Sequence, residues 1–234
     1  MLYTGLEPVG AAPAESDFEA TGLANGLAQV RRSLATLLGQ SFFVTAQMQQ
    51  QFARNRFAGV TPILMLLLAR SGYQVDQVVG VYLATDGRLC ARDFTERVDN
   101  AGVEVRYHKS GEQQLRTLVY LRVDLSNDGL AAAPGYARYV RQAYVAASYL
   151  KSASYLMHTR EFSAIRQLLL EVSPALLEDD SGIPLGEFSP EHWQWTFYGR
   201  YQSAASGFRG HTQPDLRQAF VDAAPAALPF WIGY

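Results

Sequence analysis

The strongest constraint on the fold is a pair of alternating segments, 103–108 and 114–125, on either side of Gly111. Apolar and polar residues alternate in both, which indicates half-buried strands, and a glycine between two such runs is typical of an antiparallel hairpin. Strand-like runs recur at four further places, 1–6, 75–84, 193–198 and 228–234. Strands are therefore expected at both chain ends and in the middle.

Helical periodicity separates these strands. Apolar residues spaced by three and four predict helices in four segments, 23–38, 41–54, 135–170 with a break near Thr159, and 214–223. A further apolar helix is expected between Pro62 and Gly72. Ser173-Pro174 predicts the start of a short helix that Gly182 ends. The order of elements predicts an α/β fold, with a mixed sheet and packed helices in one domain over 1–234.

Composition narrows the function classes. The 234 residues include 20 basic and 22 acidic side chains, and no stretch concentrates the basic ones, so no nucleic-acid partner is expected. The apolar run 62–69 is too short for a transmembrane segment, which needs about 20 residues. Without a signal sequence the chain as given is expected in the cytoplasm. The strand at residue 1 leaves open a missing N-terminal segment, and with it an exported or periplasmic protein.

Motifs that bind cofactors are absent from the sequence. It contains no G-x-G-x-x-G, no G-x-x-x-x-G-K-[ST] and no G-x-S-x-G. The four histidines are far apart, and Cys90 is the only cysteine, so neither a metal site nor an internal disulfide is predicted. No cofactor is therefore expected, and the sequence leaves the oligomeric state open.

The best polar constellation lies in the long helical segment. Lys151, Tyr155 and His158 are spaced by four and three, so on a continuous helix they share one face, and Arg166 follows two turns later. Such side chains contact anions and polar groups. The first hypothesis is a noncatalytic domain that binds a small polar or anionic ligand through Lys151, Tyr155, His158 and Arg166.

An acidic cluster supports a second hypothesis. Glu178, Asp179 and Asp180 fall in the last turn of the helix expected before Gly182, where the helix dipole disfavours negative charge. Either a cation, or Arg160, Arg166 or Lys151, compensates them, or they form an acidic helix end exposed to solvent. The alternative function is a hydrolase or transferase in which Asp179 and Asp180 supply carboxylates and His158 acts as general acid or base. Whether the protein is an enzyme stays open.

A third hypothesis is a protein-interaction module. It rests on the aromatic residues near the C-terminus, namely Trp193, Trp195, Phe197, Tyr198, Tyr201 and Trp231. Aromatic strands more often belong to a core. The hypothesis therefore depends on how far these side chains are exposed.

Several phrases resemble an uncharacterised family of bacterial proteins. They are Leu-Glu-Pro-Val-Gly within 5–10, the segments 149–158 (with Tyr-Leu-Met-His) and 162–166, Asp-Asp-Ser-Gly-Ile-Pro at 179–184, and the closing 230–234. The resemblance covers most of the chain and implies no activity, cofactor or catalytic residue. It implies further sequence before the first phrase, and export of some members. The family pattern reads Gln-Asp-Asp-Ser-Gly where this chain has Glu178.

Overall fold

A computed structural model describes residues 1–13, 28, 31, 59–142, 155–205, 207–221 and 230–234. Contacts within the chain cluster into two compact units. One unit comprises Gly5–Val123, and the other comprises Asp124–Tyr234 together with Met1–Thr4. The α/β class predicted from the sequence is confirmed, because helices and two sheets occur and strands lie near both chain ends. The single-domain organisation stays a prediction.

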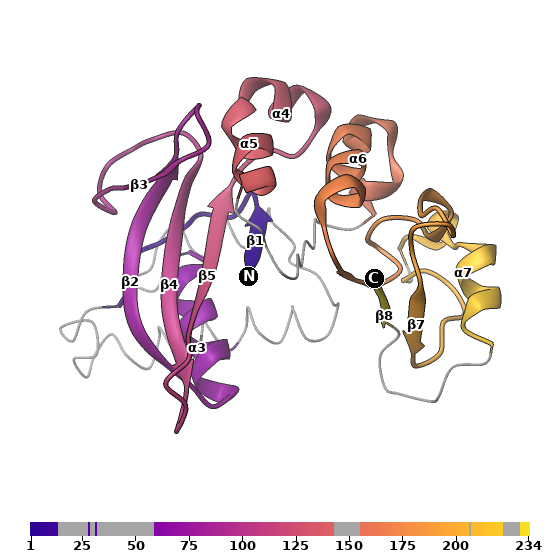
Figure 1. Ribbon diagram of the computed structural model, residues 1–234, viewed down its shortest axis with the longest axis horizontal. Coiled ribbons are helices and arrows are strands. Elements are labelled where there is room, and N and C mark those ends of the chain that lie inside the picture. The colour runs from indigo at the N-terminus through magenta and orange to yellow at the C-terminus, as the bar shows by residue number, and fades with distance from the viewer. Residues whose placement is uncertain (14–27, 29–30, 32–58, 143–154, 206, 222–229) are drawn as a thin grey trace. The chain divides into compact units, whose positions relative to one another are not determined.

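A five-stranded sheet dominates the first part of the chain (Figure 1). Its strands, in the sheet order β1-β5-β4-β2-β3, are β1 (Leu2–Gly5), β5 (Leu115–Arg122), β4 (Ala101–Lys109), β2 (Tyr73–Leu83) and β3 (Leu89–Ala91). The predicted hairpin is confirmed: β4 and β5 are antiparallel, with Val105 opposite Leu118, and Gly111 in the connection has a φ of 87°. Positive φ is the conformation that glycine adopts at no steric cost, which explains its place in this turn.

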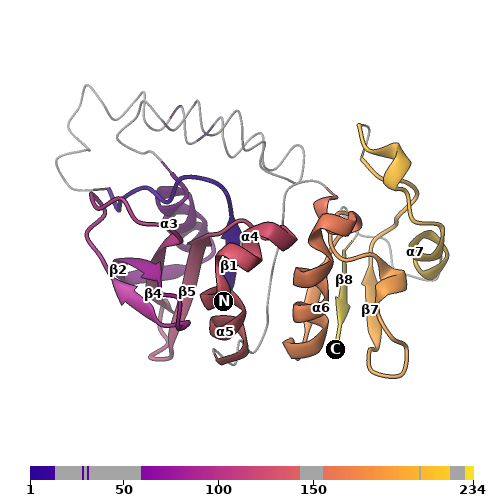
Figure 2. The same cartoon turned by 90° about the horizontal axis from the view of Figure 1, so that it is seen from above.

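Helix α3 (Thr61–Arg70) packs with this sheet, as Figures 1 and 2 show. Pro62 stands in its first turn, where the missing N–H would have no partner in the helix. Gly72, with a φ of 78°, follows its end. Ile63 of the helix and Val103 and Val105 of β4 are fully buried, and burying such a side chain stabilises by about 1.5–3 kcal/mol.

The unit that contains Asp124–Tyr234 has a three-stranded sheet. Its helices are α4 (Asn127–Ala132), α5 (Pro134–Gln142), α6 (Ser163–Val172) and α7 (Pro214–Ala219). Its strands, in the order β6-β8-β7, are β6 (Leu176–Glu178), β8 (Phe230–Gly233) and β7 (Trp195–Tyr198), and both pairs are antiparallel. Figure 2 shows β8 and β7 between α6 and α7. The strands expected over 193–198 and 228–234 are thus present.

The prediction of a short helix from Ser173-Pro174 to Gly182 is wrong. Residues Leu176–Glu178 form β6 and pair with β8, so that Glu178 lies opposite Trp231. The serine-proline signal is local, whereas the pairing partner lies more than fifty residues further along the chain. Tertiary pairing overrides local propensity here, and the helix dipole proposed to act on the acidic cluster does not exist.

The break expected near Thr159 in the helical segment 135–170 is confirmed, because residues 155–162 are not α-helical. Helix α5 is described from Pro134 to Gln142, and residues 143–154 lie outside the described part of the chain. Tyr155 has a φ of 62°, which belongs to the left-handed region. Two short 3-10 turns, Leu156–His158 and Arg160–Phe162, then lead into α6. The helix expected over 214–223 is confirmed for α7, while the helices expected over 23–38 and 41–54 lie outside the described residues.

No helix in the described segments of the chain has the length and apolar character needed to cross a bilayer.

Candidate ligand-binding site

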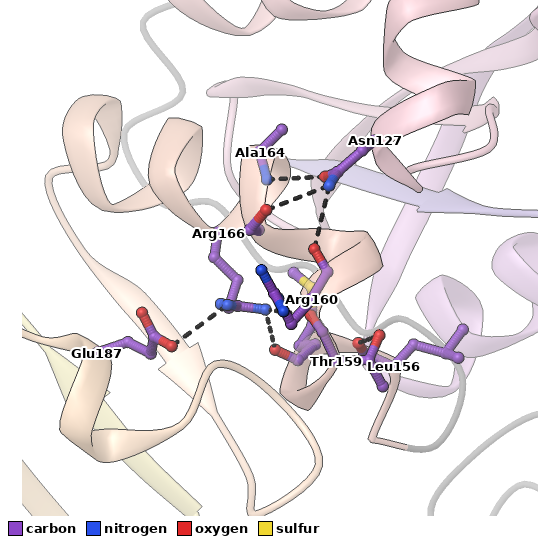
Figure 3. A network of polar contacts seen from close by, with 9 residues as sticks. Asn127, Leu156, Thr159, Arg160, Ala164, Arg166 and Glu187 are labelled. Atoms are coloured by element: carbon purple, nitrogen blue, oxygen red, sulfur yellow. Dashed lines mark hydrogen bonds and ion pairs between the residues drawn. The ribbon is translucent and has the colours of Figure 1, made fainter.

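Helix α6 positions the candidate site. Ile165, Leu168 and Leu169 are buried on one side of this helix. The flanking Phe162 provides no side-chain cap, so the first turn is capped from a distant helix: Asn127 Oδ1 accepts the N–H of Ala164 at 3.0 Å. Asn127 Nδ2 donates to the backbone oxygen of Arg160 at 3.0 Å (Figure 3). One amide side chain therefore holds α4 against the start of α6.

Arg166 lies one turn into α6 and is only 9% exposed. Its Nη1 donates to the backbone oxygen of Met157 at 2.8 Å. The same nitrogen donates to the backbone oxygen of Thr159 at 2.6 Å (Figure 3). Its Nη2 lies 3.3 Å from Oε1 of Glu187. Its Nε is buried and makes no hydrogen bond to any described residue. Two backbone oxygens thus fix one edge of the guanidinium in position. On the other edge Nη2 has an ion-pair partner and Nε has no hydrogen-bond acceptor among the described residues.

A cleft with a volume of about 770 Å³ opens beside this arginine. We call it the α6 cleft; it is lined by Ser163, Arg166, Gln167, Leu170, Glu171, Glu187, Ser189, His192 and Trp193. This volume is in the range of pockets for small organic ligands, about 300–1,000 Å³. Among the described lining residues only Leu170 and Trp193 are apolar and the other seven are polar or charged. The cleft is therefore more polar than most small-molecule pockets, which are lined mainly by apolar side chains.

The charges in the α6 cleft are largely paired. Glu171 accepts from Arg141 Nη2 of α5 at 3.1 Å, and both side chains are about half exposed. His192 Nδ1 lies 3.3 Å from Ser189 Oγ. Glu187, which is 45% exposed at its side chain, faces Arg166. Among the described residues that line the cleft, Arg166 is therefore the one buried charge. Its partner Glu187 is more exposed, so water screens the charge of Glu187 more than that of Arg166.

Tyr155 lies at the centre of a second cluster. Its side chain is 2% exposed, and its hydroxyl donates to Asp180 Oδ2 at 2.7 Å and accepts the N–H of Ala205 at 2.8 Å. Burial raises the pKa of this hydroxyl above its ordinary value, with a further contribution from Asp180. The hydroxyl therefore stays protonated and Asp180 acts as the acceptor. The ring of His211 stacks on Tyr155 with centroids 5.2 Å apart.

His158 belongs to the same cluster. Its ring meets Tyr155 edge-on at 5.3 Å and His211 at 5.4 Å between centroids. Burial, followed by the neighbouring His211, lowers the pKa of His158 below its ordinary 6.5. His158 Nε2 lies 3.1 Å from the backbone oxygen of Asp180. A carbonyl only accepts, so Nε2 carries the hydrogen and Nδ1 has the lone pair.

The three acidic residues accept hydrogen bonds from neutral donors in the described segments. Their compensation by a cation, by Arg160 or Arg166, or by Lys151, which lies outside the described residues, stays a prediction. Glu178 Oε2 accepts the N–H of Ile183 at 3.3 Å. Asp179 Oδ1 accepts the N–H of Ser181 at 2.9 Å and its hydroxyl at 2.5 Å. Asp180 accepts from Tyr155, as described above. A Cβ at Gly182 would meet the Glu178 carboxylate, so a larger residue there requires this side chain to move.

The structure brings together part of the predicted site. Tyr155, His158 and Asp180 meet, although a 3-10 turn and not an α-helix places the first two side by side. Arg166 lines the α6 cleft, and Tyr155 and His158 do not. The prediction that one helix face carries these side chains is thus wrong. Lys151 lies outside the described residues.

Sequence reasoning missed two groups. Glu187 follows Pro184 in a segment that reads as a loop, and His211 lies more than fifty residues from His158. No pattern in the neighbouring sequence marks either residue, because only the tertiary fold brings Glu187 to Arg166 and His211 to His158. Asp179, a predicted catalytic candidate, is engaged with Ser181 in its own turn.

The aromatic residues near the C-terminus are mostly in the interior. Trp193, Tyr201 and Trp231 are buried, Trp195 and Phe197 are half-buried, and Tyr198 is 39% exposed. Phe188 packs edge-on against Trp193 and Trp231 at 5.2 and 4.7 Å. These rings form a core, which weakens the support for an interaction surface.

Scans against protein-family models, curated proteins and solved structures found no match for this chain. Within the described part of the chain, no group of three or more histidine, cysteine, aspartate or glutamate side chains is placed to hold a metal ion. The features of the described chain that bear on function are therefore the α6 cleft and the cluster around Tyr155.

Proposed function

We propose that the unit containing Asp124–Tyr234 binds a small polar or anionic ligand in the α6 cleft, with Arg166 as its main polar contact. The observation that carries the proposal is a buried arginine at the wall of a cleft of about 770 Å³, with one edge of its guanidinium not fully used. A buried charge is costly unless it is paired and hydrogen-bonded. A ligand that accepts a hydrogen bond from Nε of Arg166 would interact with a guanidinium that is already held in place, so little entropy is lost on binding.

The test is a thermal-shift screen of the purified protein against carboxylates, phosphates, amino acids and sugars at millimolar concentration. A ligand that binds only the folded state raises the melting temperature. We expect at least one class to do so, and the shift to disappear in Arg166→Lys, because lysine keeps the charge and loses the planar fork. Glu171→Gln, which changes the same cleft away from Arg166, should keep the response. No shift with any class, or an undiminished shift in Arg166→Lys, would contradict the proposal.

The alternative of a hydrolase or transferase is favoured by one observation, the lone pair on Nδ1 of a histidine whose pKa is lowered. A general base of this kind is neutral near pH 7. Asp179 and Asp180 already accept internal hydrogen bonds, which leaves this alternative with less support. Turnover that needs a cation and is lost in Asp180→Ala would favour catalysis over binding.

A further inference from the structure

The guanidinium of Arg166 has two edges with different partners. Both hydrogens of Nη1 are accounted for by the backbone oxygens of Met157 and Thr159. The opposite edge consists of Nε–H and Nη2–H, the two parallel donors that a carboxylate accepts bidentately. In this structure Nε has no hydrogen-bond partner among the described residues, and Nη2 has an ion pair with Glu187 at 3.3 Å.

The ion pair of Glu187 with this edge of Arg166 is weak. Charge-assisted N–H···O bonds are usually about 2.7–2.9 Å long, so the 3.3 Å pair is long, and only one of the two donors is engaged. The Glu187 side chain is 45% exposed and lies in the short 3-10 turn Leu185–Glu187. Water therefore competes with the pair, and little holds the carboxylate in place.

We propose that the α6 cleft takes a ligand with a carboxylate group, which binds the Nε–Nη2 edge of Arg166 and displaces Glu187. Glu187 is then an internal competitor: its own carboxylate partly fills the place of the ligand's carboxylate. The inference rests on the proposed function, because it names the chemical class that this same cleft recognises. Leu170 and Trp193 in the lining favour a carboxylate attached to an apolar group.

The geometry favours a carboxylate because its two oxygens match the spacing of two parallel N–H donors. The Nη1 edge, anchored to two backbone oxygens, keeps the guanidinium plane fixed, so little conformational entropy is lost when a ligand binds. Glu171 keeps its own partner in Arg141 and does not need to move. The rearrangement is thus confined to one half-exposed side chain.

The test compares 3-phenylpropionate with its neutral amide, 3-phenylpropionamide, by calorimetric titration of the whole chain. We expect the carboxylate to bind at least about tenfold more tightly than the amide, as the loss of one charge-assisted hydrogen bond implies. Glu187→Gln should bind the carboxylate about threefold more tightly than the unmodified protein, because the half-exposed carboxylate that competes for Arg166 is removed. Its affinity for the amide should not change.

Glu171→Gln is the matched control, since it also removes one negative charge from the lining but leaves Arg166 and Glu187 in place. A gain in Glu187→Gln that exceeds the gain in Glu171→Gln supports displacement, whereas equal gains reflect net charge alone and contradict it. Weaker carboxylate binding in Glu187→Gln, or no carboxylate binding to that variant, also overturns the inference. Equal affinity for the acid and the amide, lost in Arg166→Lys, overturns the carboxylate inference and leaves the proposed function standing.

Discussion

Tyr155 combines an uncommon backbone conformation with a buried hydroxyl that serves two partners. Its φ of 62° costs about 1–2 kcal/mol in a residue other than glycine, so the surroundings must hold it there. The hydrogen bonds to Asp180 and Ala205 and the stacked His211 provide this hold. Tyr155 thus connects its own segment with those that contain Asp180 and Ala205, which lie far apart in the sequence of the same unit.

Tyr155→Phe is expected to lower the free energy of unfolding by about 1–3 kcal/mol, because it leaves the Ala205 N–H without its acceptor and removes a donor from Asp180. Urea denaturation followed by circular dichroism measures the change. Tyr234→Phe is the matched control: Tyr234 is 53% exposed and its hydroxyl lies 3.4 Å from Thr196, so a change within about 0.5 kcal/mol is expected. Equal effects of both substitutions would contradict a special role for the Tyr155 hydroxyl.

At the scale of elements, α6 depends on a cap from α4. Asn127→Ala should destabilise the protein by about 1 kcal/mol, the usual cost of losing a capping side chain. Asn127→Asp keeps an acceptor for the Ala164 N–H and adds a negative charge at the helix N-terminus, which is favourable. We therefore expect the aspartate variant to recover part of the loss in urea denaturation. An alanine variant as stable as the parent would show that the cap contributes nothing.

The large sheet depends on close approach between its strands at Gly102. A Cβ there would collide with the backbone oxygen of Tyr120 on β5 and lie 2.7 Å from Leu121 Cδ2. Gly102→Ala should therefore cost about 1–3 kcal/mol, as overpacking does. Gly210→Ala, where a Cβ meets nothing within 4 Å, should be neutral or slightly stabilising. Melting temperatures of the two variants test the contrast, and similar values would contradict it.

The elements differ in how far local pattern specifies them. The β4–β5 hairpin was predictable because Gly111 and two alternating runs are adjacent in sequence. Strand β6 was not, because the serine-proline signal before it is local and its partner β8 is remote. The same reason explains the site. The spacing of Tyr155 and His158 predicted that they share one face of a helix, and a 3-10 turn brings them together instead. Glu187 and His211 reach Arg166 and His158 only through the tertiary fold.

For the whole molecule we expect stability to fall with acidification. The pKa of His158 is lowered in the folded state from 6.5, so the unfolded chain binds the proton more readily. The stabilisation is complete above about pH 6.5 and is lost as the pH falls through the folded pKa. The groups that face His158 are Tyr155, His211, Asp179, Asp180 and Arg166.

Melting temperatures between pH 5 and 7.5 test this expectation. His158→Gln should flatten the dependence, since glutamine does not titrate. His192→Gln is the control, because the His192 side chain is exposed and lies in the α6 cleft, away from the Tyr155 cluster. If the melting temperature of His158→Gln depends on pH as strongly as that of the parent, other groups cause the pH dependence.

The division into two compact units has a consequence for spectroscopy. The three tryptophans, Trp193, Trp195 and Trp231, all belong to the unit with Asp124–Tyr234, and the single cysteine, Cys90, lies half-buried on β3 of the other unit. Tryptophan fluorescence therefore monitors one unit, and a thiol-reactive dye on Cys90 monitors the other. The natural sequence thus carries one optical probe in each unit, so that the unfolding of each is observable without introducing a label site.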